Sequence, residues 1–363
     1  MPHANKAHWQ SLFRGEPVTH TFARSVDDLV AGRRRPAPPA LSGDLAARVR
    51  LHEDVPIGGL DGTLTAEIYQ PRTPGPHPVL VYVHGGGWYT GSASMDRRYC
   101  ASIAAEGMLV VAVGYALAPE HPFPRALEDC VYAARWAVKN ADAYDGDPDR
   151  LAVAGCSAGA NLAAGTALVL HGADDQAHVE RPGTGRSGVQ RPGTRLDGGD
   201  LADMPVTVSA LLLLFGMLDA HRWICDPKYY AGEPEITLSA YLGPNFSGKL
   251  RDPLVSPALS PSLHVLPATY LSCGDEDALL GHSLAMTGRL ADADVPVTLS
   301  VVPNADHEFL KIPERVEGAR AENERIVTWL RERLGLPERA APPERVGPPE
   351  RTGLPEQEIG EAP

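Results

Sequence analysis

The sequence predicts an α/β protein with a mostly parallel central sheet that is flanked by helices. Apolar strand-like segments alternate with helical segments along most of the chain, and one such strand leads into a Gly-x-Ser-x-Gly turn at residues 155–159. A glycine-rich turn at residues 84–88 follows another apolar strand. Strands that alternate with helices pair in parallel through right-handed crossovers, with helices on both faces of the sheet.

The elements are expected in the following order. Residues 1–48 read as a polar, helical N-terminal segment that contributes to a lid, and residues 49–69 as antiparallel strands with turns. The α/β domain is expected to span residues 49–335. Its later strands are expected over residues 79–83, 109–115, 150–154, 206–214, 268–273 and 297–302, and its helices over residues 95–106, 125–140, 158–170, 281–294 and 313–334.

Three segments interrupt this alternation. The stretch 219–265 is rich in Pro, Tyr and Trp, and its part 219–250 is predicted to add to the lid over the site. Residues 172–203 are Gly-rich and polar, which predicts a flexible surface insert. The tail 336–363 repeats Pro-Glu-Arg with a period of six, and this pattern predicts disorder because it offers little to bury.

Composition narrows the class of protein. The formal net charge of −13 argues against nucleic acid or an anionic membrane as the main partner. The five cysteines are scattered without C-x-x-C spacing, so we expect free thiols and neither a disulfide framework nor a zinc site. The N-terminus lacks a signal-like apolar stretch, and the longest apolar run is too short to span a bilayer. We therefore expect a cytoplasmic protein without stable membrane insertion.

The 155–159 turn indicates a nucleophile. A strand, a sharp turn and a helix in this order would lift the Ser157 hydroxyl clear of the sheet, and the small neighbours let strand and helix approach closely. Cys156 is a weaker alternative, since its side chain should point into the packing of the turn. The glycines after His84 leave backbone N–H groups unshielded, so that they can face an anionic oxygen. A serine nucleophile and such a loop point to acyl transfer.

A serine needs an imidazole base, and the base needs a carboxylate that fixes its tautomer. In a parallel sheet both should follow the ends of later strands. His307 follows the last strand and is the expected base. The preceding strand ends in Asp275, Glu276 and Asp277, only one of which can reach the imidazole. His84 is expected to hold the glycine loop in shape through a backbone hydrogen bond.

Four blocks of the chain resemble the hormone-sensitive-lipase-like branch of the α/β-hydrolase fold, whose members are serine esterases and lipases. The blocks are residues 84–88 (HGGGW), 115–124 (YALAPEHPFP), 155–159 (GCSAG) and 306–309 (DHEF). The resemblance covers roughly residues 45 to 335. Cys156 departs from it, because the family usually has Asp or Thr before the serine.

The resemblance implies roles for particular residues. The family's acid opens a short Asp-Pro-Leu block, which Asp277 matches at 277–279, whereas the true Asp-Pro-Leu that begins at Asp252 comes too early. The family's oxyanion donors map to the N–H groups of Gly85, Gly86 and Ala158.

The function implied is a serine carboxylic-ester hydrolase that acts on short-to-medium acyl esters through Ser157, Asp277 and His307. No cofactor or metal is expected, and the resemblance allows a homodimer. Trp88 and Tyr89 are expected beside the substrate, with a core role for Trp88 as the alternative. Two other readings stay open at this point. They are an amidase or N-deacetylase with the same residues, and a non-catalytic small-ligand receptor on the same fold.

Overall fold

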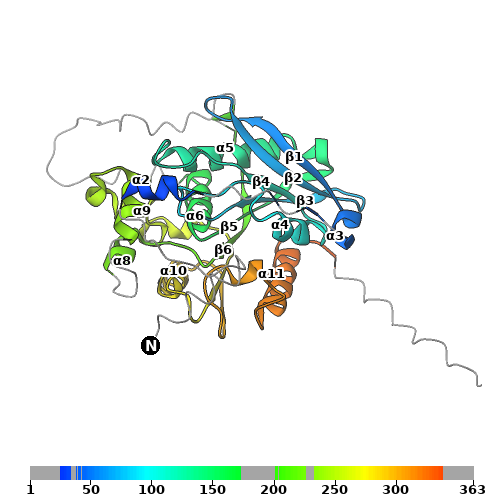
Figure 1. Cartoon of the computed structure of the whole chain (residues 1–363). Helices are drawn as coiled ribbons and strands as arrows, with labels where there is room; N and C mark the ends of the chain where they lie inside the picture. The colour runs from blue at the N-terminus through cyan, green and yellow to red at the C-terminus, as the bar shows by residue number, and fades with distance from the viewer. Residues whose placement is uncertain are drawn as a thin grey trace, which may run out of the picture.

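The computed structural model describes residues 25–33, 38, 40–41, 43–172, 201–202, 204–225 and 233–337. Eight strands form one sheet in the order β1-β2-β4-β3-β5-β6-β7-β8 (Figure 1). β1 and β2 pair in antiparallel fashion, β2 runs antiparallel to β4, and the remaining neighbours are parallel. The strands span Val49–Gly58 (β1), Leu64–Pro71 (β2), His77–Val83 (β3), Leu109–Val113 (β4), Gly146–Cys156 (β5), Val208–Leu214 (β6), Thr269–Gly274 (β7) and Val297–Val302 (β8).

Helices cover both faces of this sheet, as the alternating sequence predicts. α5 (Arg125–Lys139), α6 (Ala158–Leu170) and α10 (Leu280–Asp292) contribute to the core on one face. α4 (Arg97–Ala104) and α11 (Ala319–Arg333) contribute to the core on the other. Along β3, Val79, Val81 and Val83 face the first core and Leu80 and Tyr82 the second, because successive side chains of a strand point to opposite faces. The predicted α/β class with a mostly parallel sheet is therefore confirmed.

The element bounds agree with the sequence-based expectation to within a few residues in most cases. The last helix is the main exception, since it begins at Ala319 and not near residue 313. Gly318 has a left-handed φ of 86°, which is incompatible with a helix, and Pro313 has no N–H to donate. After β8 the chain forms a short 3-10 segment, Phe309–Lys311, and then turns over residues 313–318 before it enters α11.

Three short helices lie together beyond one end of the sheet: α2 (Val26–Ala31), α8 (Ala220–Cys225) and α9 (Glu233–Leu242) (Figure 1). α2 packs against α9, and α8 packs against α9. They come from the two parts of the sequence that are predicted to form a lid, 1–48 and 219–250. α3 (Gly43–Arg48) instead leads into β1. The predicted insert falls outside the described residues over 173–200, and so does the predicted tail over 338–363.

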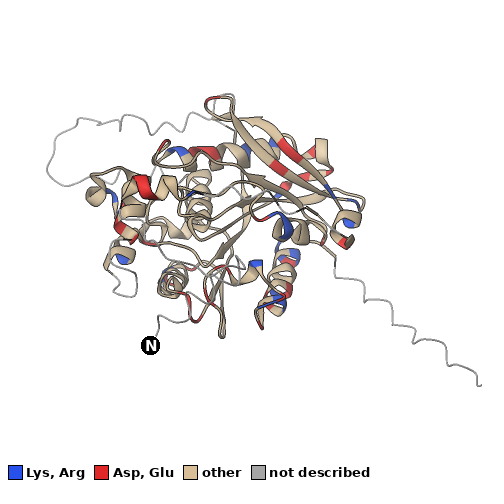
Figure 2. Ribbon diagram, viewed as in Figure 1, with Lys and Arg blue, Asp and Glu red and all other residues tan. Residues whose placement is uncertain are grey.

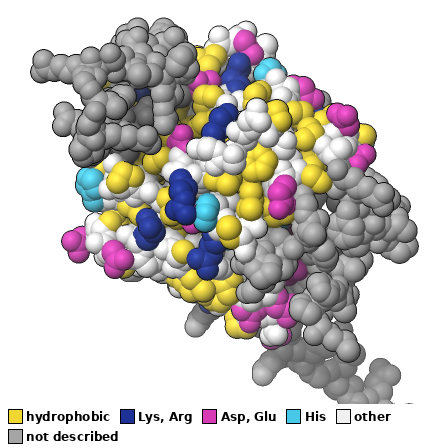
Figure 3. Space-filling model, turned by 90° about the vertical axis from the view of Figure 1, so that its left-hand side faces the viewer, with side chains coloured by type: hydrophobic (Ala, Val, Ile, Leu, Met, Phe, Trp, Pro, Cys, Tyr) yellow, Lys and Arg dark blue, Asp and Glu magenta, His cyan; other side chains and the backbone are white. Residues whose placement is uncertain are grey.

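Charged residues are distributed over the outer elements, whereas the central strands carry few (Figure 2). On the side that carries α2, α8 and α9, hydrophobic and charged side chains lie next to one another (Figure 3). Within the described part of the chain, no helix has both the length and the apolar character that a membrane crossing needs.

Candidate active site

Ser157 lies at a tight turn between β5 and α6. Its backbone has φ 54° and ψ −120°, a strained combination that residues with a side chain rarely adopt. The flanking glycines are a steric requirement. A Cβ on Gly155 would lie 2.2 Å from the Gly159 carbonyl oxygen, and a Cβ on Gly159 would lie 2.1 Å from the Val83 carbonyl oxygen. The strand and the helix can therefore approach closely only because both positions lack a side chain.

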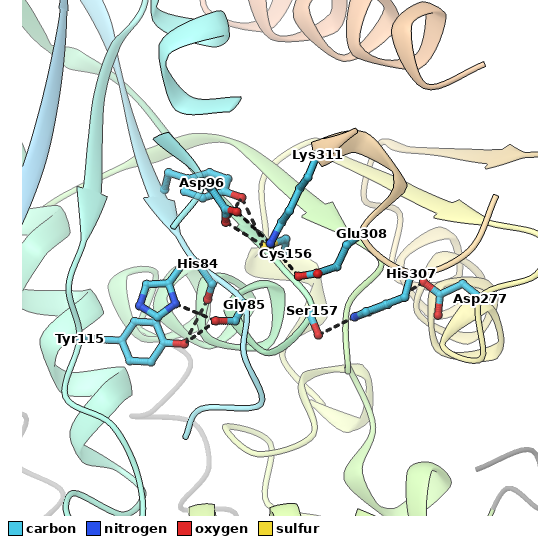
Figure 4. A network of polar contacts seen from close by, with 11 residues as sticks. His84, Gly85, Asp96, Tyr115, Cys156, Ser157, Asp277, His307, Glu308 and Lys311 are labelled. Atoms are coloured by element: carbon cyan, nitrogen blue, oxygen red, sulfur yellow. Dashed lines mark hydrogen bonds and ion pairs between the residues drawn. The ribbon is translucent and has the colours of Figure 1, made fainter. Parts of the chain in front are cut away.

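Three side chains from distant parts of the chain form one hydrogen-bonded series. Nε2 of His307 lies 2.9 Å from Oγ of Ser157, and Nδ1 of His307 lies 2.8 Å from Oδ2 of Asp277 (Figure 4). Ser157 follows β5, Asp277 follows β7 and His307 follows β8, so the carboxyl ends of three parallel strands supply the three groups. When Nδ1 carries the proton and donates it to the carboxylate, Nε2 is free to accept the hydrogen of the serine hydroxyl.

The structure selects one of the three adjacent carboxylates. Asp277 is buried, and its second oxygen accepts the backbone N–H of Leu279 at 2.7 Å. Asp275 and Glu276 are exposed, and Asp275 accepts the N–H of Ala305 at 3.4 Å. The earlier Asp-Pro-Leu segment is a turn in which Asp252 accepts the N–H of Leu254 at 3.0 Å.

The environment of His307 acts on its pKa in two directions. Burial disfavours the charged imidazolium, but the charge and the hydrogen bond of Asp277 outweigh it, and the carboxylates of Glu308 and Asp306 add to this effect. The pKa of His307 therefore lies above its ordinary value. Its side chain is still 34% exposed, so solvent screens part of this attraction.

The glycine loop is oriented by two side chains that bind its carbonyl groups. The Tyr115 hydroxyl donates to the His84 carbonyl oxygen at 3.1 Å, and Nδ1 of His84 donates to the Gly85 carbonyl oxygen at 2.7 Å. In a trans peptide the C=O and N–H groups point in opposite directions. Binding of these two carbonyls therefore turns the N–H groups of Gly85 and Gly86 away from His84 and Tyr115.

Burial keeps His84 neutral. Its ring is buried and stacks on Tyr115, with the ring centroids 4.2 Å apart and the planes at 13°. Burial lowers the pKa of His84 to about 4, against the opposing effect of its hydrogen bond to Gly85. The expected structural role of His84 agrees with this position, since it lies in the loop and is absent from the hydrogen-bonded series of Ser157.

The two aromatic residues after the glycines differ in their surroundings. Trp88 is 1% exposed and stacks on Tyr241 of α9, with centroids 4.3 Å apart and planes at 4°. Trp88 therefore lies in the core, where it joins the glycine loop to α9. This is the core role given above as the alternative to substrate contact. Tyr89 is half-buried, and its ring lies beside Gly87.

The sequence analysis did not identify Phe215 as a neighbour of His307. Phe215 packs edge-on against His307, with ring centroids 5.1 Å apart at 70°, and has a left-handed φ of 38°. The sequence signal that could have located Phe215 is its position directly after an apolar strand.

Cys156 is fully buried on the α4/α11 side of the sheet, and burial raises the pKa of its thiol to about 12. A thiol of this kind is protonated at neutral pH and is a poor nucleophile.

Among the described residues, no group of three or more His, Cys, Asp or Glu side chains is arranged to hold a metal ion. The five cysteines are free, and four of them are buried.

Comparisons with known proteins identify relatives of this chain. Residues 80–311 match the model of a family described as alpha/beta hydrolase fold. The carboxylesterase NlhH of Mycobacterium tuberculosis is 39% identical over 150 residues, which are 41% of this chain and 46% of that protein. The matched region thus spans about half the length of this relative. An ethyl acetate hydrolase of Pseudomonas putida is 31% identical over 291 residues, 77% of this chain and 82% of that protein.

Among solved structures, a bacterial heroin esterase superposes with a TM-score of 0.65 at 28% identity. The match covers 85% of this chain and 88% of that one. The likeness therefore extends over most of both chains.

Proposed function

The chain belongs to the hormone-sensitive-lipase-like family of α/β hydrolases, and from this premise we propose that it is a serine carboxylic-ester hydrolase. The observation that carries the proposal is the hydrogen-bonded series from Ser157 through His307 to Asp277, with contacts of 2.9 and 2.8 Å. The names of the relatives, which are carboxylesterases and an ethyl acetate hydrolase, support hydrolysis of esters with a short acyl group.

In the proposed reaction, Ser157 Oγ attacks the ester carbonyl carbon while Nε2 of His307 takes its proton. Asp277 holds the imidazole in the tautomer with Nδ1 protonated and stabilises the imidazolium that forms. The imidazolium then gives its proton to the leaving alcohol, which departs and leaves an acyl-enzyme. A water molecule then attacks this ester while His307 takes its proton, and the imidazolium returns that proton to Ser157 Oγ as the acid leaves.

We assign stabilisation of the tetrahedral oxyanion to the N–H groups of Gly85, Gly86 and Ala158. The first two point away from the carbonyl groups that His84 and Tyr115 bind. Ala158 is the first residue of α6, and the first N–H groups of a helix have no partner within it. Donors held in place before the reaction stabilise the developing charge without reorganisation.

We also propose that α2, α8 and α9 form a cap over the site, because α9 contacts the glycine loop through Trp88 and Tyr241. A small cap favours short-to-medium acyl groups. The proposed location is the cytoplasm, which the five unpaired cysteines support.

The test combines covalent labelling with paired substrates. A fluorophosphonate probe should label the wild-type protein at Ser157, as identified by peptide mass spectrometry, and labelling should block hydrolysis of p-nitrophenyl acetate. Rates for p-nitrophenyl acetate and p-nitroacetanilide, which share the acyl group, separate an esterase from an amidase. Absence of both labelling and hydrolysis would instead favour a ligand receptor.

A further inference from the structure

A partly buried ionic cluster lies next to His307 and plays no part in the proposed reaction. Nζ of Lys311 lies 2.8 Å from Oδ1 of Asp96 and 2.7 Å from Oε1 of Glu308 (Figure 4). The side chains of Asp96, Lys311 and Glu308 are 1%, 13% and 29% exposed. We call these three residues the Lys311 cluster. Asp96 precedes α4, whereas Glu308 and Lys311 follow β8, so the cluster joins segments that are distant in the sequence.

The cluster connects the two loops that carry the serine and the base. Glu308 directly follows His307. At the other end, the Asp96 carboxylate accepts the Tyr82 hydroxyl at 2.9 Å and the Cys156 thiol at 3.6 Å, and Cys156 directly precedes Ser157. A continuous series of polar contacts therefore runs from the neighbour of the base, through Lys311, to the neighbour of the serine.

The contacts between Lys311 and Glu308 stabilise an unfavourable backbone conformation of Glu308. Glu308 has φ 64° in the left-handed region, which is unfavourable for a residue with a side chain. Two contacts with Lys311 hold it there, because the Lys311 N–H donates to the Glu308 carbonyl oxygen at 3.0 Å while Nζ binds the carboxylate. Because Glu308 directly follows His307, the backbone conformation of Glu308 affects the position of the His307 imidazole.

We propose that Lys311 is a positioning residue that, through Glu308 and Asp96, holds His307 at the correct distance from Ser157. This inference rests on the proposed function, because it assigns Lys311 a role in a reaction that needs His307 as the base. Lys311 does not touch the reacting atoms. Instead, it fixes the distance between the loop that carries Ser157 and the loop that carries His307, two residues that are 150 positions apart in the sequence.

The charges around the Lys311 cluster predict how loss of the Lys311 cation would change the pKa of His307. His307 faces the carboxylates of Asp277, Asp306 and Glu308, as well as the Phe215 ring. Lys311 faces Asp96 and Glu308, with the neutral groups Cys156 and His84 also close by. Burial opposes the charge of Lys311, but Asp96 and Glu308 outweigh it, and the pKa of Lys311 lies well above its ordinary value. Removal of this cation would take away positive charge beside the Glu308 carboxylate, which lies next to His307, and the imidazolium would be favoured.

The main test is Lys311→Met, which keeps the aliphatic stem and removes the charge. A cavity of about 240 Å³, lined by Asp96, Glu308 and Lys311 among others, leaves room for the methionine. We expect kcat for p-nitrophenyl acetate to fall by about 10- to 100-fold, with KM within about threefold of wild type. The midpoint of the kcat/KM profile should move to higher pH by about half a unit or more. The rate constant of Ser157 labelling should fall in parallel.

Two further variants make the test specific. Glu308→Gln removes the negative charge next to the base, so it should also lower kcat but move the midpoint to lower pH, opposite in sign to Lys311→Met. Arg98→Met is the matched control. Arg98 lines the same cavity as Lys311, but its ion pair is with Glu314, and the two side chains of that pair are 60% and 48% exposed. Its kcat and pH profile should equal those of wild type.

Lys311→Met could also act through the buried Asp96 charge that it leaves unpaired. The double variant Lys311→Met/Asp96→Asn removes that charge, while the ion pair between Glu308 and Lys311 stays broken. A low kcat at wild-type thermal stability supports positioning, whereas restoration of kcat overturns it. Wild-type kcat and pH midpoint in folded Lys311→Met, or in Glu308→Gln, also overturn it. The proposed function fails separately, when Ser157→Ala retains hydrolysis in an otherwise wild-type chain.

Discussion

A Cβ atom on Gly159 would lie 2.1 Å from the carbonyl oxygen of Val83. Gly159 belongs to the first turn of α6 and Val83 is the last residue of β3, so the helix that follows Ser157 lies directly against the strand that leads into the glycine loop. The obstacle is backbone, which cannot move aside as a flexible side chain could. The proposed nucleophile and the proposed oxyanion loop are thus brought together by a contact that requires glycine.

Gly159→Ala should therefore destabilise the protein by more than about 3 kcal/mol, because strand and helix must separate. Gly288→Ala is the matched control in α10, where an added Cβ has no atom within 4 Å. This variant should stabilise the protein by about 0.5–1 kcal/mol, the usual advantage of Ala over Gly inside a helix. Urea unfolding of both variants measures the difference. Equal stability of the two would contradict the close approach.

Ser157→Ala should lower kcat on the order of 10⁶-fold, as expected when the nucleophile of a serine hydrolase is removed, while the fold stays intact. Steady-state rates on p-nitrophenyl acetate and a thermal unfolding curve check both parts. The control is Ser102→Ala, since this exposed serine of α4 donates only to the Tyr99 carbonyl. Activity of Ser157→Ala within tenfold of wild type would mean that another group is the nucleophile.

Asp277→Asn should lower kcat by roughly 10⁴-fold, because the amide can donate to the imidazole and hold it in the wrong tautomer. Asp275→Asn and Asp252→Asn should have far smaller effects, because Asp277 is the carboxylate that bonds to His307, whereas Asp275 accepts the N–H of Ala305 and Asp252 accepts the N–H of Leu254. Parallel kinetics of the three variants give the ranking. A larger loss in Asp275→Asn than in Asp277→Asn would reverse the assignment.

The pH dependence follows from the shifted pKa of His307. In the proposed mechanism Ser157 is activated only while His307 is neutral, so kcat/KM should rise with pH through one ionisation. The net effect of Asp277 over burial raises this pKa, so the midpoint should lie above about 6.5, the ordinary value for histidine. A profile of kcat/KM between pH 5 and 9 tests it. A midpoint clearly below 6.5 would show that burial outweighs the carboxylate.

By itself, the sequence determined the class of fold, the order of its elements and three of the loops that form the site. These features depend on local patterns. A strand over Val79–Val83, a helix from Ala158 and the glycines around Ser157 each follow from residues that are close together in the chain. The late start of α11 at Ala319 is the kind of boundary that a local pattern locates poorly.

Only the tertiary structure decided which groups meet. From the residues alone, Asp275, Glu276 and Asp277 were equivalent candidates for the acid, and the backbone turn after β7 buries one and exposes the others. The stacking of Trp88 on Tyr241 and the contacts of Lys311 with Asp96 join segments more than 100 residues apart. Such distances depend on how the strands, helices and loops pack in three dimensions, and no local periodicity in the chain encodes them.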